Sequence, residues 1–386
     1  MKKYIYSFIL IVIIALGIGV VVIQKQPKQN NNAFSQEAAD ISSQPFNEIF
    51  RGKVLEVLEK EVEQNRHLSQ ITETLKVEVS SGAEKGKEIT VDYQDTLTNE
   101  KLQEVKKGDV IVIGKLTYGE EVGYVMVDRY RLPYLGFIGV IFLALAIIFG
   151  RLRGLTSVVG LMVSIAILVW FVTPNILAGK NPIFVTLVGA GVIAIISIYL
   201  AHGFSKRTSL AVVSTLLTLG LAQALAYFFV AGSHLAGNGS EDAFFLQAGY
   251  FGAINLQGLF LGGIIIGTLG ILDDITTTQT AAIEEIHTAN TELSFKQLYQ
   301  KGGSIGREHI TSLINTLVLT YAGASLPLFL LFSVDSNKQL WTIINSGTIA
   351  EEIVRTLVGS IALIIAVPIS TALAAYFYNN EYNKLK

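Results

Sequence analysis

The sequence predicts an α-helical polytopic membrane protein with about eight transmembrane helices and one small extracytoplasmic all-β domain. The first observation is composition: of 386 residues, 51% are hydrophobic and 16% are charged, whereas a soluble protein has about 25% charged residues. The second is a series of apolar runs from Leu132 onward, each near the length that crosses a bilayer. The third is residues 48–130, where short runs alternate apolar and polar residues between turn signals.

Residues 1–23 are predicted to form an N-terminal signal-anchor transmembrane helix. Lys2 and Lys3 precede an apolar run over residues 4–23, which is longer than the core of a cleaved signal peptide, usually about 7–15 residues. A signal peptide is the alternative, but Gln24-Lys25-Gln26-Pro27 is a poor cleavage site. Residues 24–47 are rich in Gln, Asn and Ser, so we expect a flexible linker there.

Residues 48–130 predict a β domain, either a small barrel similar to the oligonucleotide/oligosaccharide-binding (OB) fold or a sandwich. The alternation is typical of half-buried strands. It covers Lys53–Leu58, Leu75–Val79, Glu88–Tyr93, Asp109–Ile113 and Gly123–Val127. A helical stretch from Leu58 to Leu68 is expected to interrupt these strands.

Residues 131–386 are predicted to form a seven-helix membrane domain. The expected spans are 132–149, 155–173, 182–201, 208–231, 252–273, 310–332 and 353–377. Basic residues gather in alternate short loops, at Arg151, Arg153, Lys206, Arg207, Lys296, Lys301, Arg307, Lys384 and Lys386. Because basic loops remain in the cytoplasm, both termini are predicted to be cytoplasmic and the β domain extracytoplasmic.

The strongest candidate site is the aspartate pair Asp273 and Asp274, at the end of a glycine-rich apolar span. Small residues at four-residue spacing allow helix backbones to approach closely, and we expect this of Gly258, Gly262, Gly263, Gly267 and Gly270. Carboxylates at membrane depth are costly, which favours a functional role. The pair is therefore a candidate for ion or proton coupling.

The segment 274–309 is expected to be a cytoplasmic amphipathic segment. Helical spacing places Thr277, Thr280, Glu284 and His287 on one face with Asp273. Glu284 and His287 are further candidates for ion or proton coupling, since carboxylates and imidazoles bind and relay protons. The alternative is a solvated polar face. No metal is expected, because one Glu-x-x-His pair on one helix is not a site.

Other polar residues within or near the spans have two interpretations each. Arg307 could pair with the aspartates or reach lipid headgroups. Gln223, Asn315 and Thr316 lie inside expected spans, where they join helices through hydrogen bonds or line a substrate path. Ser294 and Gln297 form a capping box, and the helix that they begin is expected to stop at Gly302-Gly303.

Several function classes are disfavoured by what the sequence lacks. It has no cysteine, which excludes disulfides and thiol catalysis. A formal net charge of −2 without a basic stripe gives no indication of nucleic-acid binding. No phosphate-binding loop of the Walker type appears, so ATP hydrolysis is not expected. We expect neither enzymatic activity nor a cofactor.

Several motifs resemble the YibE/F-like family of bacterial multi-pass membrane proteins. They are Arg51-Gly52-Lys53-Val54, Asp128-Arg129-Tyr130-Arg131, Gly267-Thr268-Leu269-Gly270-Ile271-Leu272-Asp273-Asp274, Ser304-Ile305-Gly306-Arg307-Glu308-His309 and Asn315-Thr316-Leu317-Val318-Leu319. The outer domain makes the chain similar to the longer, YibE-type members. The resemblance implies a location in the bacterial plasma membrane and a shorter YibF-type companion subunit, with a homo-oligomer as the alternative. It implies no established activity.

Two functional hypotheses follow. The first is a transporter or transport-complex subunit that is coupled to protons or cations, which the aspartate pair and the glycine-rich helix favour. The second is a non-transporting membrane scaffold or sensor, whose outer β domain binds a protein or an envelope partner.

Overall fold

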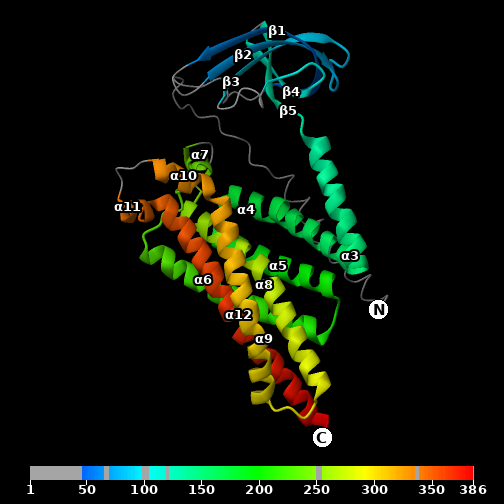
Figure 1. Ribbon diagram of the computed structural model, residues 1–386, viewed down its shortest axis with the longest axis vertical. Coiled ribbons are helices and arrows are strands. Elements are labelled where there is room, and N and C mark those ends of the chain that lie inside the picture. The colour runs from blue at the N-terminus through cyan, green and yellow to red at the C-terminus, as the bar shows by residue number, and fades with distance from the viewer. Residues whose placement is uncertain are drawn as a thin grey trace. The chain divides into compact units, whose positions relative to one another are not determined.

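The computed structural model describes residues 46–64, 69–97, 104–118, 121–248, 254–334 and 339–385. They belong to two units that divide near Ala144, the first rich in strands and the second helical (Figure 1). The predicted signal-anchor helix at 1–23 and nearly all of the predicted linker at 24–47 lie outside the described residues.

The first unit contains a closed five-stranded barrel. Its strands are β1 (Glu48–Gln64), β2 (Ser69–Val79), β3 (Glu88–Leu97), β4 (Val110–Tyr118) and β5 (Glu121–Arg129), and they pair in the order β1-β2-β3-β5-β4. The pair β3 and β5 is parallel and the other neighbours are antiparallel. The prediction of a small β domain is confirmed, and the barrel is formed rather than the sandwich. Its extracytoplasmic location stays a prediction.

The core of the barrel follows from alternation along its strands. On β2, Leu75, Val77 and Val79 are buried, and Ile113 on β4 packs with them. Gly52 on β1 lies where a Cβ atom would collide with the side chains of Val77 and Ile113. Glycine therefore lets β1 cross closely over the core at this point.

The predicted helical stretch from Leu58 to Leu68 is wrong for residues 58–64. Residues 65–68 lie outside the described residues. Strand β1 continues through these residues and pairs with β2, from Glu59 opposite Thr74 to Gln64 opposite Ser69. Pairing with β2 satisfies the backbone groups of this segment, whereas an isolated helix of this length is marginal in water. Tertiary pairing thus overrides the local pattern.

Five helical segments of the described chain are long and apolar enough to cross a membrane. They are Leu132–Leu177, Pro182–His202, Lys206–Gly232, Leu256–Ala289 and Gly347–Asn380. A helical membrane protein is thus supported, while the predicted count of eight spans stays a prediction. The first segment comprises α3 (Leu132–Ile167), the π-helical stretch η2 (Leu168–Val172) and α4 (Thr173–Leu177). Helix α3 breaks at Arg151, where φ is 53° and ψ is −136°, between the two spans expected at 132–149 and 155–173.

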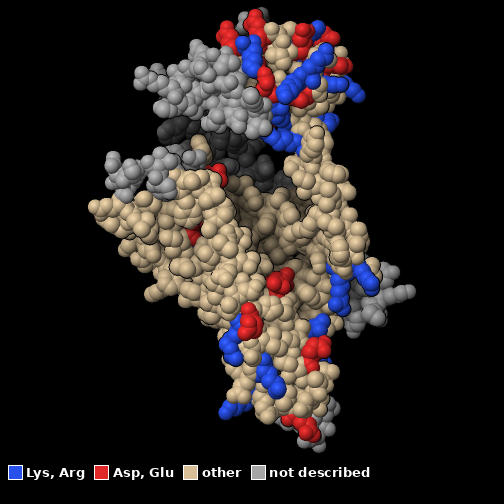
Figure 2. Space-filling view, viewed as in Figure 1, with Lys and Arg blue, Asp and Glu red and all other residues tan. Residues whose placement is uncertain are grey.

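The helical bundle is built around α8 (Leu256–Ala289). This helix packs against α5 (Pro182–His202), α6 (Lys206–Gly232), α9 (Phe295–Ala324) and α12 (Gly347–Leu385) (Figure 1). The shorter helices α7 (Glu241–Ala248), α10 (Leu326–Val334) and α11 (Leu340–Ile344) lie in the connections. Charged side chains gather near the junction of α8 and α9, whereas the middle of the bundle is mostly uncharged in this view (Figure 2). That distribution suits a bundle surrounded by lipid.

Helix α8 is longer than the span expected at 252–273. It contains 34 residues and continues unbroken past Asp273 to Ala289. At the α-helical rise this is about 51 Å, well beyond the hydrocarbon thickness of about 30 Å. Ile275 and Ile283 are fully buried in the bundle. The beginning of segment 274–309 is therefore the second half of a central helix.

Helix α9 begins as predicted and ends later. Ser294 and Gln297 form the predicted capping box, which confirms that start. The expected stop at Gly302-Gly303 is wrong, because α9 continues unbroken to Ala324. A Cβ atom on Gly302 would collide with Ile283 of α8. The glycine serves close packing between helices and does not end the helix.

Candidate functional site

The two predicted aspartates occupy different environments on α8. Asp273 is partly buried, and its Oδ1 atom is buried without a hydrogen-bond partner among the described residues. The side chain of Ser197, on α5, faces its carboxylate. Asp274 is exposed, because consecutive helical residues point about 100° apart. Of the pair, Asp273 is the carboxylate that the bundle encloses.

A buried polar face follows Asp273 along α8. Thr276, Gln279 and Thr280 are almost completely inaccessible to solvent. The hydroxyl of Thr276 is 2.7 Å from that of Thr215 on α6. Of the predicted polar face, Thr277 and Thr280 are buried, so the alternative of a solvated face does not hold for these two residues.

Gln279 joins three helices. Its Nε2 atom donates to the backbone oxygen of Gly302 on α9 and to the hydroxyl of Thr371 on α12, each at 2.8 Å. Its Oε1 atom is buried with no hydrogen-bond partner in the described part of the chain. This amide was not singled out from the sequence. Gln279 lies between Asp273 and Glu284 in the sequence, one helical turn before Ile283. That position could have identified it as a candidate site residue.

Glu284 and His287 meet around one tyrosine at the far end of α8. The carboxylate of Glu284 accepts hydrogen bonds from Arg207 Nη1 at 3.0 Å and from the Tyr378 hydroxyl at 2.9 Å. The imidazole of His287 stacks on the Tyr378 ring, with centroids 5.4 Å apart. No cluster of three or more His, Asp or Glu side chains that could hold a metal occurs among the described residues. The arrangement is an ion-pair and hydrogen-bond junction of α6, α8 and α12.

A small crevice reaches this polar face from the end that carries Arg207. Its volume is about 210 Å³, and His202, Arg207, Thr208, Thr277 and Thr278 are among its lining residues. Thr277 is one helical turn from Asp273, about 6 Å along the helix axis.

The remaining predicted residues are distributed over several contacts. Gly262 fits against Thr186 of α5, and Gly258 lies beside Pro182 at the start of α5. Gly267 faces the Tyr321 hydroxyl of α9, whereas Cβ atoms at Gly263 and Gly270 would meet open space. Only some of these glycines therefore lie at close helix contacts.

The predicted polar residues of the spans are not gathered at one place. Gln223 on α6 has a buried Oε1 atom without a partner among the described side chains. Asn315 and Thr316 on α9 are exposed, and Thr316 donates to the backbone oxygen of Ser312. Arg307 is exposed. No described ion pair joins it to Asp273 or Asp274.

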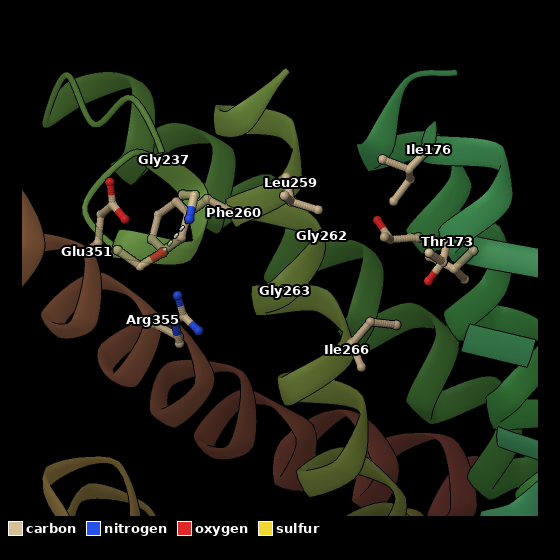
Figure 3. A pocket seen from close by; sticks show the side chains of 14 residues that line it. Thr173, Ile176, Gly237, Leu259, Phe260, Gly262, Gly263, Ile266, Glu351 and Arg355 are labelled. Carbon is tan, nitrogen blue, oxygen red and sulfur yellow. Dashed lines mark hydrogen bonds between the residues drawn. The ribbon is translucent and has the colours of Figure 1, made fainter. Parts of the chain in front are cut away.

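A larger cavity lies at the opposite end of the bundle and was missed in the sequence. Its volume is about 420 Å³. Glu351 and Arg355 of α12 line one side, Thr173 and Ile176 line the other, and the backbone of α8 near Gly263 lies between them (Figure 3). The signal was Glu351-Glu352-x-x-Arg355 at the beginning of the expected span 353–377, which places charge within or near membrane depth.

Comparison with known proteins gives a match to a protein family. The sequence profile of a family described as "YibE/F-like protein" matches residues 138–380. The matched region includes α5 through α9 and most of α12, and it begins after the last strand of the barrel. No curated protein and no solved structure matches the chain.

Proposed function

Because the chain belongs to the YibE/F-like family, we propose that it is a plasma-membrane transporter or transport-complex subunit that is coupled to protons or small cations. The observation that carries the proposal is Asp273, a carboxylate enclosed by the bundle with one oxygen atom that has no hydrogen-bond partner among the described residues. A partly buried carboxylate that no described ion pair compensates gains most from binding a proton or a cation.

The position of Asp273 between two openings supports the same function. The large cavity reaches α8 as far as Ile266, and the crevice reaches Thr277 from the other end. At the helical rise, Asp273 is about 10 Å from Ile266 and about 6 Å from Thr277 along the axis. A coupling group that two openings approach from opposite sides is what alternating access requires.

The direction of the openings is part of the proposal. The crevice lies near Lys206 and Arg207, in one of the basic loops, and basic loops remain in the cytoplasm. The crevice would then face the cytoplasm, and the large cavity and the β barrel would face the outside. A shorter YibF-type subunit, or further copies of the chain, would complete the complex.

A second candidate is a scaffold or sensor. The observation that favours it is the barrel itself, which lies in a separate unit and has its own hydrophobic core. In this case the barrel binds a protein or an envelope partner, and the helices hold it at the membrane. Deletion of residues 48–130 separates the two functions, since transport would survive in part and partner capture would be lost entirely.

Ion flux through the purified full chain tests the transport proposal. In proteoliposomes under an imposed membrane potential, the wild-type protein should admit protons, Na⁺ or K⁺ faster than empty vesicles. Asp273→Asn should reduce that flux at least tenfold, because the amide cannot take up the charge. Asp274→Asn is the matched control and should retain most of it. Full flux in Asp273→Asn, or wild-type flux equal to that of empty vesicles both with and without a co-reconstituted YibF-type subunit, would falsify the proposal.

A further inference from the structure

The large cavity lies where several helices begin or end. It is bounded by the end of η2 and α4, the α6–α7 connection, and the first turns of α8 and α12. Its volume of about 420 Å³ lies in the range of small-molecule sites, roughly 300–1,000 Å³. The proposed function uses this cavity only as an opening, so its own chemistry remains to be explained.

Arg355 supplies a cation that its surroundings satisfy only in part. Its Nε atom is buried without a hydrogen-bond partner among the described residues. Its Nη2 atom is 3.5 Å from Glu352 Oε1, and its guanidinium lies over the Phe260 ring at 5.4 Å from the centroid. A guanidinium has five N–H donors and binds carboxylates in a two-pronged geometry. Apart from the contact with Glu352, no described hydrogen bond or ion pair uses the Nη donors, so these donors are available for a ligand carboxylate.

Glu351 supplies an anion one helical turn away on the same helix. The side chain is 5% exposed, and its Oε1 atom accepts a hydrogen bond from Gly239 N at 3.1 Å. That bond fixes the carboxylate against the loop after α6. The backbone of Gly237 is a second hydrogen-bond partner of this carboxylate. Because a carboxylate can accept at about four positions, Glu351 keeps acceptor capacity for a ligand.

The charge balance distinguishes between ligand classes. Glu351 and Arg355 are the charged residues that line this cavity, one acid and one base. A ligand with only a carboxylate places no opposite charge beside Glu351, and a ligand with only an ammonium places none beside Arg355. A ligand with both groups brings no net charge and places each group beside an opposite one.

The rest of the wall suits a small molecule with an apolar part. Ile176, Leu259 and Ile266 contribute hydrocarbon, and Thr173 contributes a hydroxyl. Gly263 leaves the backbone of α8 open on this side. Apolar walls with a few placed polar groups are typical of sites that orient a ligand by its charged end.

We propose that this cavity binds a small zwitterionic molecule, a free amino acid or a dipeptide, with its carboxylate on Arg355 and its ammonium beside Glu351. The role of this cavity as the substrate site of a transporter rests on the proposed function. Binding itself does not require Asp273.

Ligand binding to the full chain in lipid nanodiscs tests the proposal directly. The probes are L-alanine, L-leucine and L-alanyl-L-alanine. Two further probes isolate the charges of leucine: 4-methylpentanoate, which lacks the amine, and 3-methylbutylamine, which lacks the carboxylate. At least one zwitterion should raise the unfolding temperature in a saturable way. If leucine is the ligand, its two single-charge analogues should bind at least tenfold more weakly. Failure of all three zwitterions, or equal binding of 4-methylpentanoate, overturns the proposal.

Three variants connect binding to the named residues. Arg355→Gln should weaken zwitterion binding at least tenfold. Glu351→Gln keeps an oxygen acceptor for Gly239 N but removes the charge, and it should weaken binding of the zwitterion more than binding of the deaminated analogue. Glu285→Gln is the control, because Glu285 is exposed on α8 and lines neither this cavity nor the smaller one beside it, and it should retain binding. Unfolding temperatures without ligand show whether each variant is folded, and a folded Arg355→Gln protein with unchanged affinity contradicts the assignment.

One additional measurement separates this inference from the transport proposal. Asp273→Asn protein should bind the zwitterion with wild-type affinity while its flux is lost. Saturable binding without any wild-type flux refutes transport and leaves the ligand site standing. Ion flux without any zwitterion binding refutes the ligand site and leaves the transport proposal standing.

Discussion

Three buried polar atoms on α8 have no hydrogen-bond partner among the described residues. They are Asp273 Oδ1, Gln279 Oε1 and His287 Nδ1. Each atom of this kind costs about 1–3 kcal/mol, and such groups are rare in folded proteins unless water or an ion satisfies them. All three lie on the helix that carries the proposed coupling carboxylate. Their common location is what the proposed coupling role of α8 requires.

Glu73 in the barrel gives a pH-dependent prediction. Its side chain is 1% exposed. Burial raises the pKa of its carboxyl, an effect opposed by the Lys60 ammonium 3.9 Å away. A raised folded pKa means that Glu73 stabilises the barrel at acidic pH and that this contribution is lost as the pH rises through the folded pKa. We therefore expect Glu73→Gln to stabilise the barrel at pH 7.5 by about 1–3 kcal/mol, and not at pH 4.

Hydrogen exchange of β1–β3 peptides in the full chain measures this effect. Exchange in Glu73→Gln should be slower than in the wild type at pH 7.5, with the difference vanishing at acidic pH. Glu78→Gln, at an exposed position on the same strand, should leave exchange unchanged. Faster exchange in Glu73→Gln at pH 7.5 would mean that the attraction of the Lys60 ammonium outweighs the cost of burying the carboxylate.

Tyr378 gives a second prediction at the residue scale. Its hydroxyl donates to Glu284, which also binds Arg207. Tyr378→Phe removes only that hydroxyl, so the unfolding free energy should fall by about 1.5–3 kcal/mol, the range for hydrogen bonds to charged groups. Thermal unfolding in detergent measures the change. Tyr376→Phe, at a position that is 63% exposed, should have no effect, and an equal loss in both variants would exclude the Glu284 contact as the cause.

At the scale of elements, α9 is held to α8 and α12 by glycines on one of its faces. A Cβ atom on Gly306 would collide with Val367 of α12 and would lie 3.1 Å from Gln279 Oε1. Gly306→Ala should therefore destabilise the bundle by about 1–3 kcal/mol through overpacking. Thermal unfolding of the detergent-solubilised chain gives the measurement.

Gly303→Ala is the matched control for this packing. Its Cβ atom would have only Arg307 Nη1 nearby, at 3.9 Å. Replacing an unhindered helical glycine by alanine stabilises by about 0.5–1 kcal/mol. The two substitutions should therefore change stability in opposite directions. Stabilisation by both would show that α9 has room to move away from α12.

The elements that the sequence predicted correctly are those set by local interactions. The capping box at Ser294 joins residues three positions apart, so the start of α9 could be recognised. The end predicted at Gly302-Gly303 depended on contacts with Ile283, which no local pattern reveals. The length of β1 was missed for the same reason, since β2 supplies its pairing.

At the scale of the whole molecule, the absence of cysteine allows a direct test of orientation. Single cysteines at Asn238, between α6 and α7, and at Thr291, between α8 and α9, lie in loops at opposite ends of the bundle. A membrane-impermeant maleimide added to intact cells should label Asn238→Cys and spare Thr291→Cys. Ser80→Cys in the barrel should be labelled as well. Labelling of Thr291→Cys alone would reverse the proposed orientation.

The candidate site was only partly predictable, because it combines residues from distant parts of the chain. Asp273 could be recognised as an unusual charge in an apolar helix. Its separation from the exposed Asp274 depended on which face of α8 meets α5. Glu351 and Arg355 were overlooked, because charges at the edge of an apolar run are ordinarily interfacial. Only the packing of α12 beside α8 shows that they border a cavity.

Closure of the barrel limits how anything can attach to it. The five strands pair in a ring, with β4 returning to β1 over Glu48–Lys53 and β3 meeting β5 at Asp92. Beyond these pairs, the segments 56–64 of β1 and 93–97 of β3 pair with β2 alone among the described strands. An extended peptide that joins the sheet as an additional strand, a common mode of peptide capture, therefore finds an open edge at these two segments. Strand β2 is paired on both sides, so a partner over β2 must be recognised through side chains.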